Sequence, residues 1–211
     1  MTLPPWRPLL RSGLHREGRS PAARWLQLAS VAADGTPRVR TLVFRGWDGH
    51  SRMLLYTDGR SGKNAELTRQ PAVEICWLLA KARQQYRFRG TVALCSIAQD
   101  ADHCSNHWRQ LSPGGRALWA WPEPGQPFKA SAEYPTELDE TTPPPQHFLV
   151  LTLTIERVSC WISAITPIAG WPGPKRSCGM NNGSTPDHHQ RSTRPTDGLP
   201  GLEGTVTTDS R

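Results

Sequence analysis

The alternation of apolar and polar residues is clearest around position 150 of this 211-residue chain. In the segment HFLVLTLTIERV (147–158), every second residue from Leu149 to Ile155 is apolar, and Thr152 and Thr154 lie between them. A period of two residues is typical of a β-strand that buries one face. The pattern therefore predicts a strand over 147–158.

Five earlier runs have strand character. The stretch RWLQLASVAADGTPRVRTLVFRGW holds two of them, joined around Asp34-Gly35, and a second Asp-Gly pair at 48–49 leads into RMLLYT. Asp-Gly favours the tight turns of β-hairpins. The other two runs are AVEICWLLA and QQYRFRGTVALCS; in the second, Tyr86 and Phe88 share one face while Gln85 and Arg87 share the other.

Three segments have helical character instead. PPWRPLLRSGLHR predicts a short amphipathic helix, because four apolar residues fall near helical spacing: Trp6, Leu9, Leu10 and Leu14. DGRSGKNAELTRQP predicts a loop and then a helix that ends before Pro71, and 99–119 predicts two short helices interrupted by SPGG. A Pro-rich loop then leads to the last strand. Six strands with short helices, joined mostly by hairpin signals, predict a mainly β, antiparallel barrel.

From Ser159 onward the chain shows no period, no helix caps and no coherent apolar face. The segment is rich in Pro and Gly, and the mean hydropathy of the whole chain is -0.54. Both features are typical of a globular body with a poorly folding extension. We expect one domain over 1–158 and a largely disordered tail over 159–211.

Charge and cysteine content narrow the functional classes. The net charge is +7, but the basic residues are dispersed and no run of five occurs, which favours a phosphorylated small molecule over nucleic acid as partner. Five cysteines without a CxxC pair, and an N-terminus without a signal-peptide pattern, predict a cytoplasmic protein. No apolar run reaches membrane-spanning length, so no membrane partner is expected.

The first candidate for ligand binding is the strand RTLVFRG. Arg40 projects to the same face as Leu42, whereas Arg45 lies with Thr41 and Val43 on the other. Two arginines at opposite ends of one strand can bracket an anion. The alternative is that both are solvated strand residues.

The second candidate is YTDGRSGKNAEL. Ser61 stands where a helix N-cap belongs, so unpaired N–H groups and the positive end of the helix dipole would meet the charges of Arg60 and Lys63. This arrangement suits a phosphate group. The glycine spacing before Gly62-Lys63 excludes a Walker loop. An ordinary capped surface helix is the alternative.

Two further groups carry weaker signals. Gln85 can donate to and accept from a heteroaromatic edge, although a polar strand face open to water explains it equally well. His103, Cys104 and His107 lie close in sequence, but two more ligands in a closed pattern would be needed for zinc, and no metal is expected. No catalytic triad or acid-base pair of carboxylates stands out, so catalytic residues stay unassigned.

Taken in order, these motifs resemble the FMN-binding split barrel of the pyridoxamine 5'-phosphate oxidase family, and in particular its cyanobacterial and plant-type branch. The resemblance runs from about Leu3 to Val158. Five ordered motifs carry it: RTLVFRG (40–46), TDGRSGK (57–63), EICWLL (74–79), RQQYR (83–87) and LWAWPEPG (118–125).

The resemblance implies FMN bound at a homodimer interface. It assigns the cofactor contacts to Arg40, Thr41, Leu42, Val43, Arg45, Tyr56, Thr57, Arg60, Ser61, Lys63 and Gln85. Two positions depart from the family pattern. Arg45 stands where better-known members have Lys, and Gly62 stands where oxidases carry a phosphate-binding Arg, for which Arg60 would compensate.

The resemblance also implies an oxidoreductase whose candidate substrate is a B6 vitamer. The residues that hold the substrate phosphate in the oxidases fall near Trp108, Ser112 and Arg116, of which Arg116 alone is basic. Two other functions stay open: a flavin- or haem-binding split barrel without turnover, and an inactive product of a frameshifted gene.

A change of reading frame accounts for the tail. If the codons after Val158 are chosen among synonyms and one G is inserted, the other frame reads VELLDLRHHPHRRVAWTEEELWDEQWLNP and then stops. That sequence has the strand, basic cluster and terminal NP with which family members continue. We therefore expect the chain from Ser159 to be frameshift-derived, with read-through after Pro186.

Overall fold

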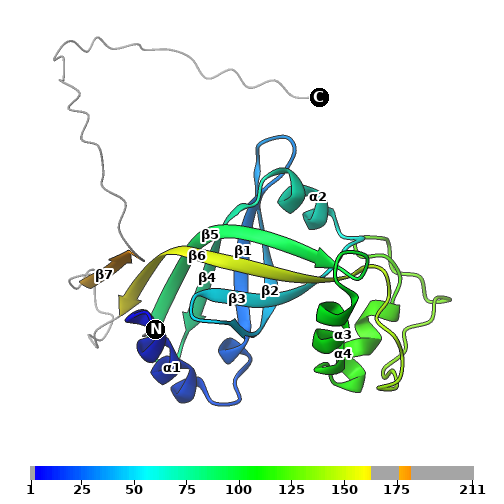
Figure 1. The fold of residues 1–211 in the computed structure, drawn as a ribbon, viewed down its shortest axis with the longest axis horizontal. Helices are drawn as coiled ribbons and strands as arrows, with labels where there is room; N and C mark the ends of the chain where they lie inside the picture. The colour runs from blue at the N-terminus through cyan, green and yellow to red at the C-terminus, as the bar shows by residue number, and fades with distance from the viewer. Residues whose placement is uncertain (1–2, 163–175, 182–211) are drawn as a thin grey trace, which may run out of the picture.

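Six antiparallel strands close a barrel in the computed structural model, which describes residues 3–162 and 176–181 (Figure 1). The strands of the described chain are β1 (Trp25–Val31), β2 (Pro37–Asp48), β3 (Arg52–Asp58), β4 (Ala72–Leu79), β5 (Gln84–Ser96), β6 (Phe148–Ile162) and β7 (Arg176–Asn181). The helices are α1 (Trp6–Glu17), α2 (Gly62–Arg69), α3 (Ala101–Arg109) and α4 (Pro113–Ala117), with 3-10 turns η1 (Pro21–Ala23) and η2 (Leu118–Ala120).

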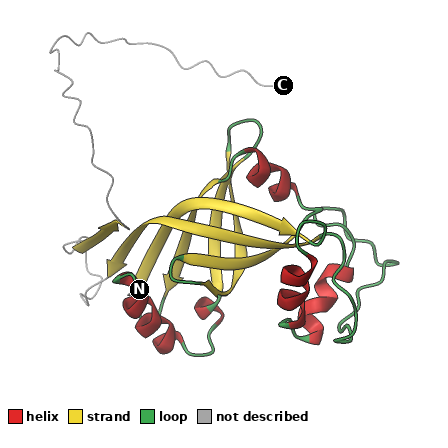
Figure 2. Ribbon diagram, viewed as in Figure 1, coloured by secondary structure: helices red, strands yellow, loops and turns green. Residues whose placement is uncertain are grey.

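The sheet order is β3-β2-β1-β4-β5-β6-β7, and an additional pairing of β3 with β6 closes the ring. That closure runs from Arg52 opposite Thr154 to Asp58 opposite Phe148. Both neighbours of β6 within the barrel are thus antiparallel to it. The predicted mainly β, antiparallel barrel of about six strands is confirmed (Figure 2).

Both predicted Asp-Gly turns are present. Gly35 has a φ of 81° and Gly49 a φ of 67°, in the left-handed region that glycine enters without strain. At the first turn, Oδ1 of Asp34 also accepts a hydrogen bond from the backbone N–H of Thr36 at 3.0 Å. The turns thereby fix the β1–β2 and β2–β3 hairpins.

The main core fills the barrel, and α1 covers part of it. Trp6 and Leu10 of α1 are buried against this core, but Leu9 is 40% exposed, so the predicted apolar face was wrong at that position. Gly13 also lies close to the barrel: a Cβ there would stand 2.4 Å from Oε1 of Gln84. Trp6, Leu10 and Gly13 thus form the side of α1 that packs against the barrel. Leu9 is on a more exposed side of the helix.

A smaller core, which we call the α3 cluster, lies outside the barrel where α3 and α4 stand (Figure 1). β3 and β6 contribute residues to it, since alternate side chains on these strands face out of the barrel. Its buried members are Leu54, Tyr56, Cys104, Trp108, Leu111, Trp119, Phe148 and Val150. Two short helices are present over 99–119 as expected, but the SPGG segment begins α4, with Ser112 as its N-cap, instead of interrupting the helices.

Two β-bulges interrupt the ladders. Between β2 and β3 the register shifts at Phe44/Gly46, so Arg45 has no residue opposite it. Between β5 and β6 the register shifts at Arg89/Gly90. A Cβ on Gly90 would come within 2.0 Å of the Thr154 carbonyl oxygen, so the two backbones approach too closely for any other residue.

β6 ends at Ile162, four residues beyond the predicted end at Val158. It continues because β5 begins at Gln84 and offers backbone partners as far as Ile162, with Cys160 buried in the core. The domain boundary at 158 and the frameshift stay predictions. Residues 163–175 and 182–211 of the expected tail lie outside the described residues.

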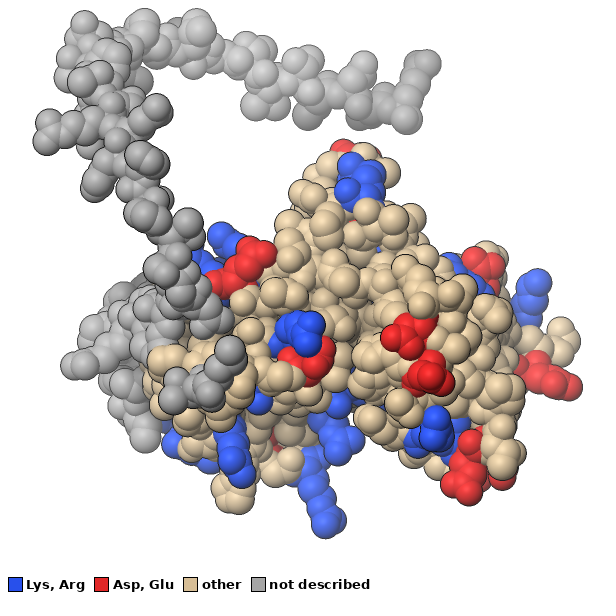
Figure 3. All heavy atoms as spheres, in the orientation of Figure 1, with Lys and Arg blue, Asp and Glu red and all other residues tan. Residues whose placement is uncertain are grey.

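On the face shown in Figure 3, Lys and Arg are scattered among Asp and Glu of the described residues instead of forming a continuous band. In the described part of the chain, no helix is both long and apolar enough to cross a membrane.

Candidate functional site: a cationic surface along β2, β3 and the start of α2

The bulge in β2 places Arg45 beside β3. Its Cζ lies 5.2 Å from the centroid of the Tyr56 ring, within the range of a cation–π interaction. Its Nε is buried and has no hydrogen-bond partner among the described residues. Burial lowers the pKa of this guanidinium. A half-buried cation with a buried, unused donor suits an anionic or strongly polar ligand, because such a donor is costly to leave without a partner.

Tyr56 links this strand to α3. Its hydroxyl lies 3.0 Å from Nδ1 of His107, whose ring stacks edge-on against that of His103 with centroids 4.6 Å apart. Burial raises the pKa of Tyr56. Burial, and then the nearby His103, lowers the pKa of His107, which favours the neutral imidazole.

Thr57 stands next on β3. Its side chain is 2% exposed, and its Oγ1 has no partner among the described residues. Oγ1 of Thr57 on β3 and Nε of Arg45 on β2 are thus two buried polar atoms without a hydrogen-bond partner among the described residues. A bound ligand could supply the missing hydrogen bonds.

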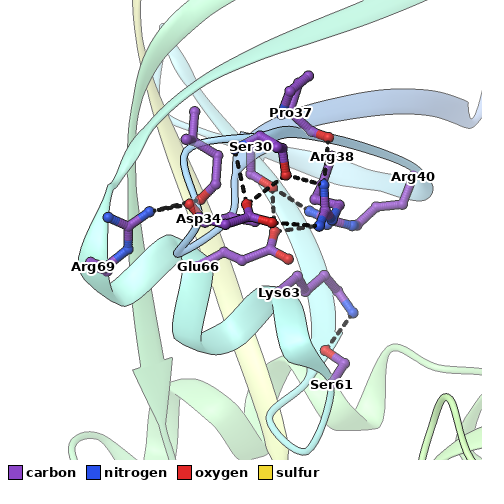
Figure 4. Close-up of polar contacts among 12 residues, drawn as sticks. Ser30, Asp34, Pro37, Arg38, Arg40, Ser61, Lys63, Glu66 and Arg69 are labelled. Atoms are coloured by element: carbon purple, nitrogen blue, oxygen red, sulfur yellow. Dashed lines mark hydrogen bonds and ion pairs between the residues drawn. The ribbon is translucent and has the colours of Figure 1, made fainter.

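The start of α2 carries the second set of predicted residues (Figure 4). Ser61 precedes the helix as expected, but its side chain makes no capping bond. Its Oγ instead donates to the Asp58 carbonyl oxygen at 2.6 Å and accepts from Nζ of Lys63 at 2.7 Å. Burial, and then the charge of Arg40, lowers the pKa of Lys63. The helix N–H groups and Lys63 thus meet at one place.

Arg40 is tied to its own surroundings. One guanidinium nitrogen lies 2.7 Å from Oε2 of Glu66, and the other donates to the Ser30 hydroxyl (Figure 4). The Ser30 hydroxyl donates in turn to the same Glu66 oxygen at 2.6 Å. The positive charge of Arg40 is therefore neutralised by Glu66 within the protein. The sequence did not predict this contact, because Glu66 is 26 residues away.

Arg60 is likewise paired. It forms a bidentate contact with Asp58, with the shortest distance of 2.7 Å, and donates to the Trp121 carbonyl oxygen at 3.1 Å. This pairing spans only two residues, so the DGR triplet was a local signal for it.

Gln85 lies elsewhere. It is on β5, and in the ring of strands β2 and β5 are three steps apart in either direction. Adjacent strands are about 4.8 Å apart, so this separation is roughly 14 Å or more around the barrel. Thr41 and Val43 stay with Arg45 on β2, while Leu42 is buried in the barrel core. One protomer does not bring Gln85 to the other predicted residues.

The predicted substrate residues are engaged in the helical layer. Trp108 donates from its indole N–H to the Thr142 carbonyl oxygen at 2.6 Å. Ser112 caps α4 by accepting from the N–H of Gly115 at 3.1 Å. Arg116 is buried and donates to the Leu111 carbonyl oxygen at 2.6 Å. These contacts give all three a structural role, and their role in binding a substrate stays a prediction.

No group of three His, Cys, Asp or Glu side chains gathers as a metal site within the described residues. Cys104, which the sequence placed between His103 and His107, is buried in the α3 cluster. Burial raises its pKa to about 12, which keeps the thiol protonated at neutral pH.

Comparison with known proteins identifies the class to which this barrel and its cationic surface belong. The family model for the FMN-binding domain of pyridoxamine 5'-phosphate oxidase matches residues 3–96. A crystal structure of a pyridoxamine 5'-phosphate oxidase-related, FMN-binding protein from Nostoc punctiforme is 30% identical, with a TM-score of 0.71. The match covers 86% of this chain and 100% of that one. The molecule is an FMN-binding split barrel, and the chain belongs to the pyridoxamine 5'-phosphate oxidase family.

Two other known proteins are also similar to this chain. Pyridoxine/pyridoxamine 5'-phosphate oxidase 2 of Arabidopsis thaliana is 29% identical over 161 residues, which cover 73% of this chain and 81% of the relative. PhzG from Burkholderia lata shares the fold with a TM-score of 0.59 at 16% identity, over 83% of this chain and 91% of that one. The predicted family and its cofactor, FMN, are confirmed.

The residues present fit FMN. Its phosphate needs cations and N–H donors, which Lys63 and the start of α2 provide, and its polar groups need partners such as Nε of Arg45 and Oγ1 of Thr57. Bound FMN supplies the redox chemistry. The chain's own part is to bind and orient the cofactor.

Proposed function

We propose that this protein is an FMN-dependent oxidoreductase that works as a homodimer, with a B6 vitamer as its candidate substrate. The observation that carries the proposal is the half-buried guanidinium of Arg45, whose Nε is buried with no hydrogen-bond partner among the described residues and which lies over the Tyr56 ring. Removing such a donor from water costs free energy, which a hydrogen bond from a bound ligand would offset. The name of the Arabidopsis relative supports the choice of substrate class.

The position of Gln85 supports dimerisation. If Gln85 contacts the same flavin as Arg45, a second copy must supply it, because the two residues are on opposite strands of the ring. The outer face between them exposes three large apolar side chains: Trp25, Val39 and Leu78. An interface over this face would bury them. A cytoplasmic location accompanies this proposal as the expectation from the sequence.

A second candidate is flavin binding without turnover of a B6 phosphate ester. Trp108, Ser112 and Arg116 favour it, since their polar atoms already bond to the protein's own backbone or cap a helix. A substrate phosphate would have to break these contacts.

Two measurements on the purified full chain separate the candidates. Yellow colour with a flavin spectrum tests cofactor binding, and release of hydrogen peroxide upon addition of pyridoxamine 5'-phosphate tests turnover. We expect both. Colour without peroxide would support the second candidate, and a colourless protein that takes up no added FMN would contradict both. Arg52→Gln, an exposed strand arginine paired with Asp48, serves as the control for nonspecific effects.

A further inference from the structure

Three arginines gather on the outer face of β4, β5 and β6, away from the surface of β2, β3 and α2. Arg87 and Arg89 share this face of β5, and Arg89 stands directly opposite Arg157 of β6. Like charges in directly opposed positions destabilise a sheet. The β5–β6 bulge beside Gly90 sets this register.

One carboxylate contacts two of the three arginines. Glu74 of β4 accepts from Nη2 of Arg89 at 2.8 Å and lies 3.6 Å from Nη1 of Arg87. No ion pair involves Arg157 among the described residues. The cluster therefore carries three positive charges against one negative charge.

A hollow of about 100 Å³ lies in the middle of this cluster. Its lining is Glu74, Arg87, Arg89, Arg157 and Ser159. The guanidinium of Arg87 also faces the Trp161 ring, with Cζ 5.7 Å from its centroid. Guanidinium groups around a small polar hollow match the geometry of an oxyanion, which accepts their N–H groups in pairs.

We propose that Arg87, Arg89 and Arg157 form a binding site for a small oxyanion, a phosphate or a carboxylate. The anion would lie between Arg89 and Arg157, where the repulsion is greatest, and would accept from the Ser159 hydroxyl. This site shares no residue with the proposed cofactor contacts, although Gln85 lies on the same strand, β5, two residues before Arg87.

The alternative reading frame supports the same chemistry. Inserting one G after the Val158 codon puts glutamate at the position of Ser159, which is directly opposite Arg87 in the register. A carboxylate from the chain itself would then lie in the hollow. In the present chain, a dissolved oxyanion takes that place.

The test is calorimetric titration of the full chain with inorganic phosphate at constant ionic strength. We expect binding that weakens at least about tenfold in Arg157→Gln, a loss typical of one charged hydrogen-bonding partner. Ser159→Glu should abolish the binding and raise the melting temperature, because the new carboxylate neutralises the cluster. Arg52→Gln should leave phosphate binding unchanged. Phosphate binding that persists in Lys63→Gln distinguishes this site from the start of α2.

Absence of phosphate binding up to about 10 mM would overturn the proposal, since that is weaker than the affinity of any useful site. Binding that survives both Arg157→Gln and Ser159→Glu would overturn it as well. Loss of all phosphate binding in Lys63→Gln would place the anion at α2 and also overturn it. If Arg157→Gln does not fold, Ser159→Glu decides alone, and a lower melting temperature with phosphate binding retained would count against the site.

Discussion

The guanidinium of Arg45 lies over the ring of Tyr56, and the hydroxyl of the same tyrosine is hydrogen-bonded to His107. A cation on the proposed cofactor surface is therefore connected through one side chain to helix α3. This chain of contacts joins the barrel to the outer helical layer at the point where FMN is expected to bind.

Replacing Arg45 with methionine separates binding from stability. We expect Arg45→Met to weaken FMN binding about tenfold or more, because a charged donor to the ligand is lost. The melting temperature of the FMN-free protein should stay the same or rise, because a half-buried guanidinium with an unsatisfied Nε gives way to an apolar side chain of similar length that can still pack on Tyr56. Flavin fluorescence quenching and thermal unfolding measure the two effects. Arg52→Met is the matched control, and unchanged FMN affinity in Arg45→Met would contradict the assignment.

FMN affinity should fall as the pH rises toward 10. The pKa of Lys63 lies below its usual value of 10.5, so the free protein loses this charge earlier than an exposed lysine would. A bound phosphate favours the charged form, so binding takes up a proton and weakens as pH passes through the lowered pKa. Titrations between pH 7 and 10 should show this slope, and Lys63→Gln should reduce it. An equal slope in both proteins would exclude Lys63 as a phosphate ligand.

Stability should decrease as the pH falls below 6.5. The pKa of His107 is lowered in the folded protein from its usual 6.5, so the unfolded chain binds the proton first. The contribution of neutral His107 is present above pH 6.5 and is lost as the pH falls through the folded value. Thermal unfolding of His107→Gln between pH 7.5 and 5 should show a smaller loss than the unaltered chain. A loss of the same size would mean that other groups cause it.

Gly90→Ala should destabilise the barrel by about 3 kcal/mol or more, a magnitude reserved for severe packing or backbone conflicts. The added Cβ would meet the Thr154 carbonyl oxygen at 2.0 Å, and neither strand can move without breaking the β5–β6 ladder. Gly62→Ala is the matched control, since a Cβ there meets nothing within 4 Å. Denaturant unfolding should place that variant within about 0.5 kcal/mol of the unaltered chain.

Restoring the reading frame after Val158 should improve both FMN binding and dimerisation. The continuation VELLDLRHHPHRRVAWTEEELWDEQWLNP would replace the present residues from Ser159. Fluorescence titration and light scattering on the two proteins side by side test this expectation. Equal affinities and equal masses would refute a functional role for the alternative segment. Independent sequencing of the locus tests the frameshift itself.

Local patterns predicted the strands, both Asp-Gly turns and the positions of the short helices. They failed where the outcome depends on distant partners. Leu9 has helical spacing, but α1 packs on the barrel through Trp6, Leu10 and Gly13, and Leu9 stays exposed. The continuation of β6 to Ile162 depends on where β5 begins, which the sequence of β6 does not contain.

The candidate site was likewise predicted only where local patterns determine it. The motifs pointed to Arg45, Ser61 and Lys63; Arg45 lies over Tyr56 of β3, and Lys63 donates to the Ser61 hydroxyl at the start of α2. That Arg40 would be neutralised by Glu66 could not be predicted, because the contact joins a strand to a helix that follows much later. The bulge that separates Arg45 from the regular ladder arises from pairing with β3 and has only Gly46 as a local sign.

The pairing of β3 with β6 determines which part of the barrel a change of reading frame after Val158 would leave intact. Every backbone pair that seals the ring lies at or before Thr154, upstream of the position where the reading frame is proposed to change. The β3–β6 pairs are thus encoded upstream of that position, whereas the β5–β6 pairs from Ser159 to Ile162 lie downstream of it. A chain altered after Val158 therefore keeps the pairing that joins the two ends of its sheet.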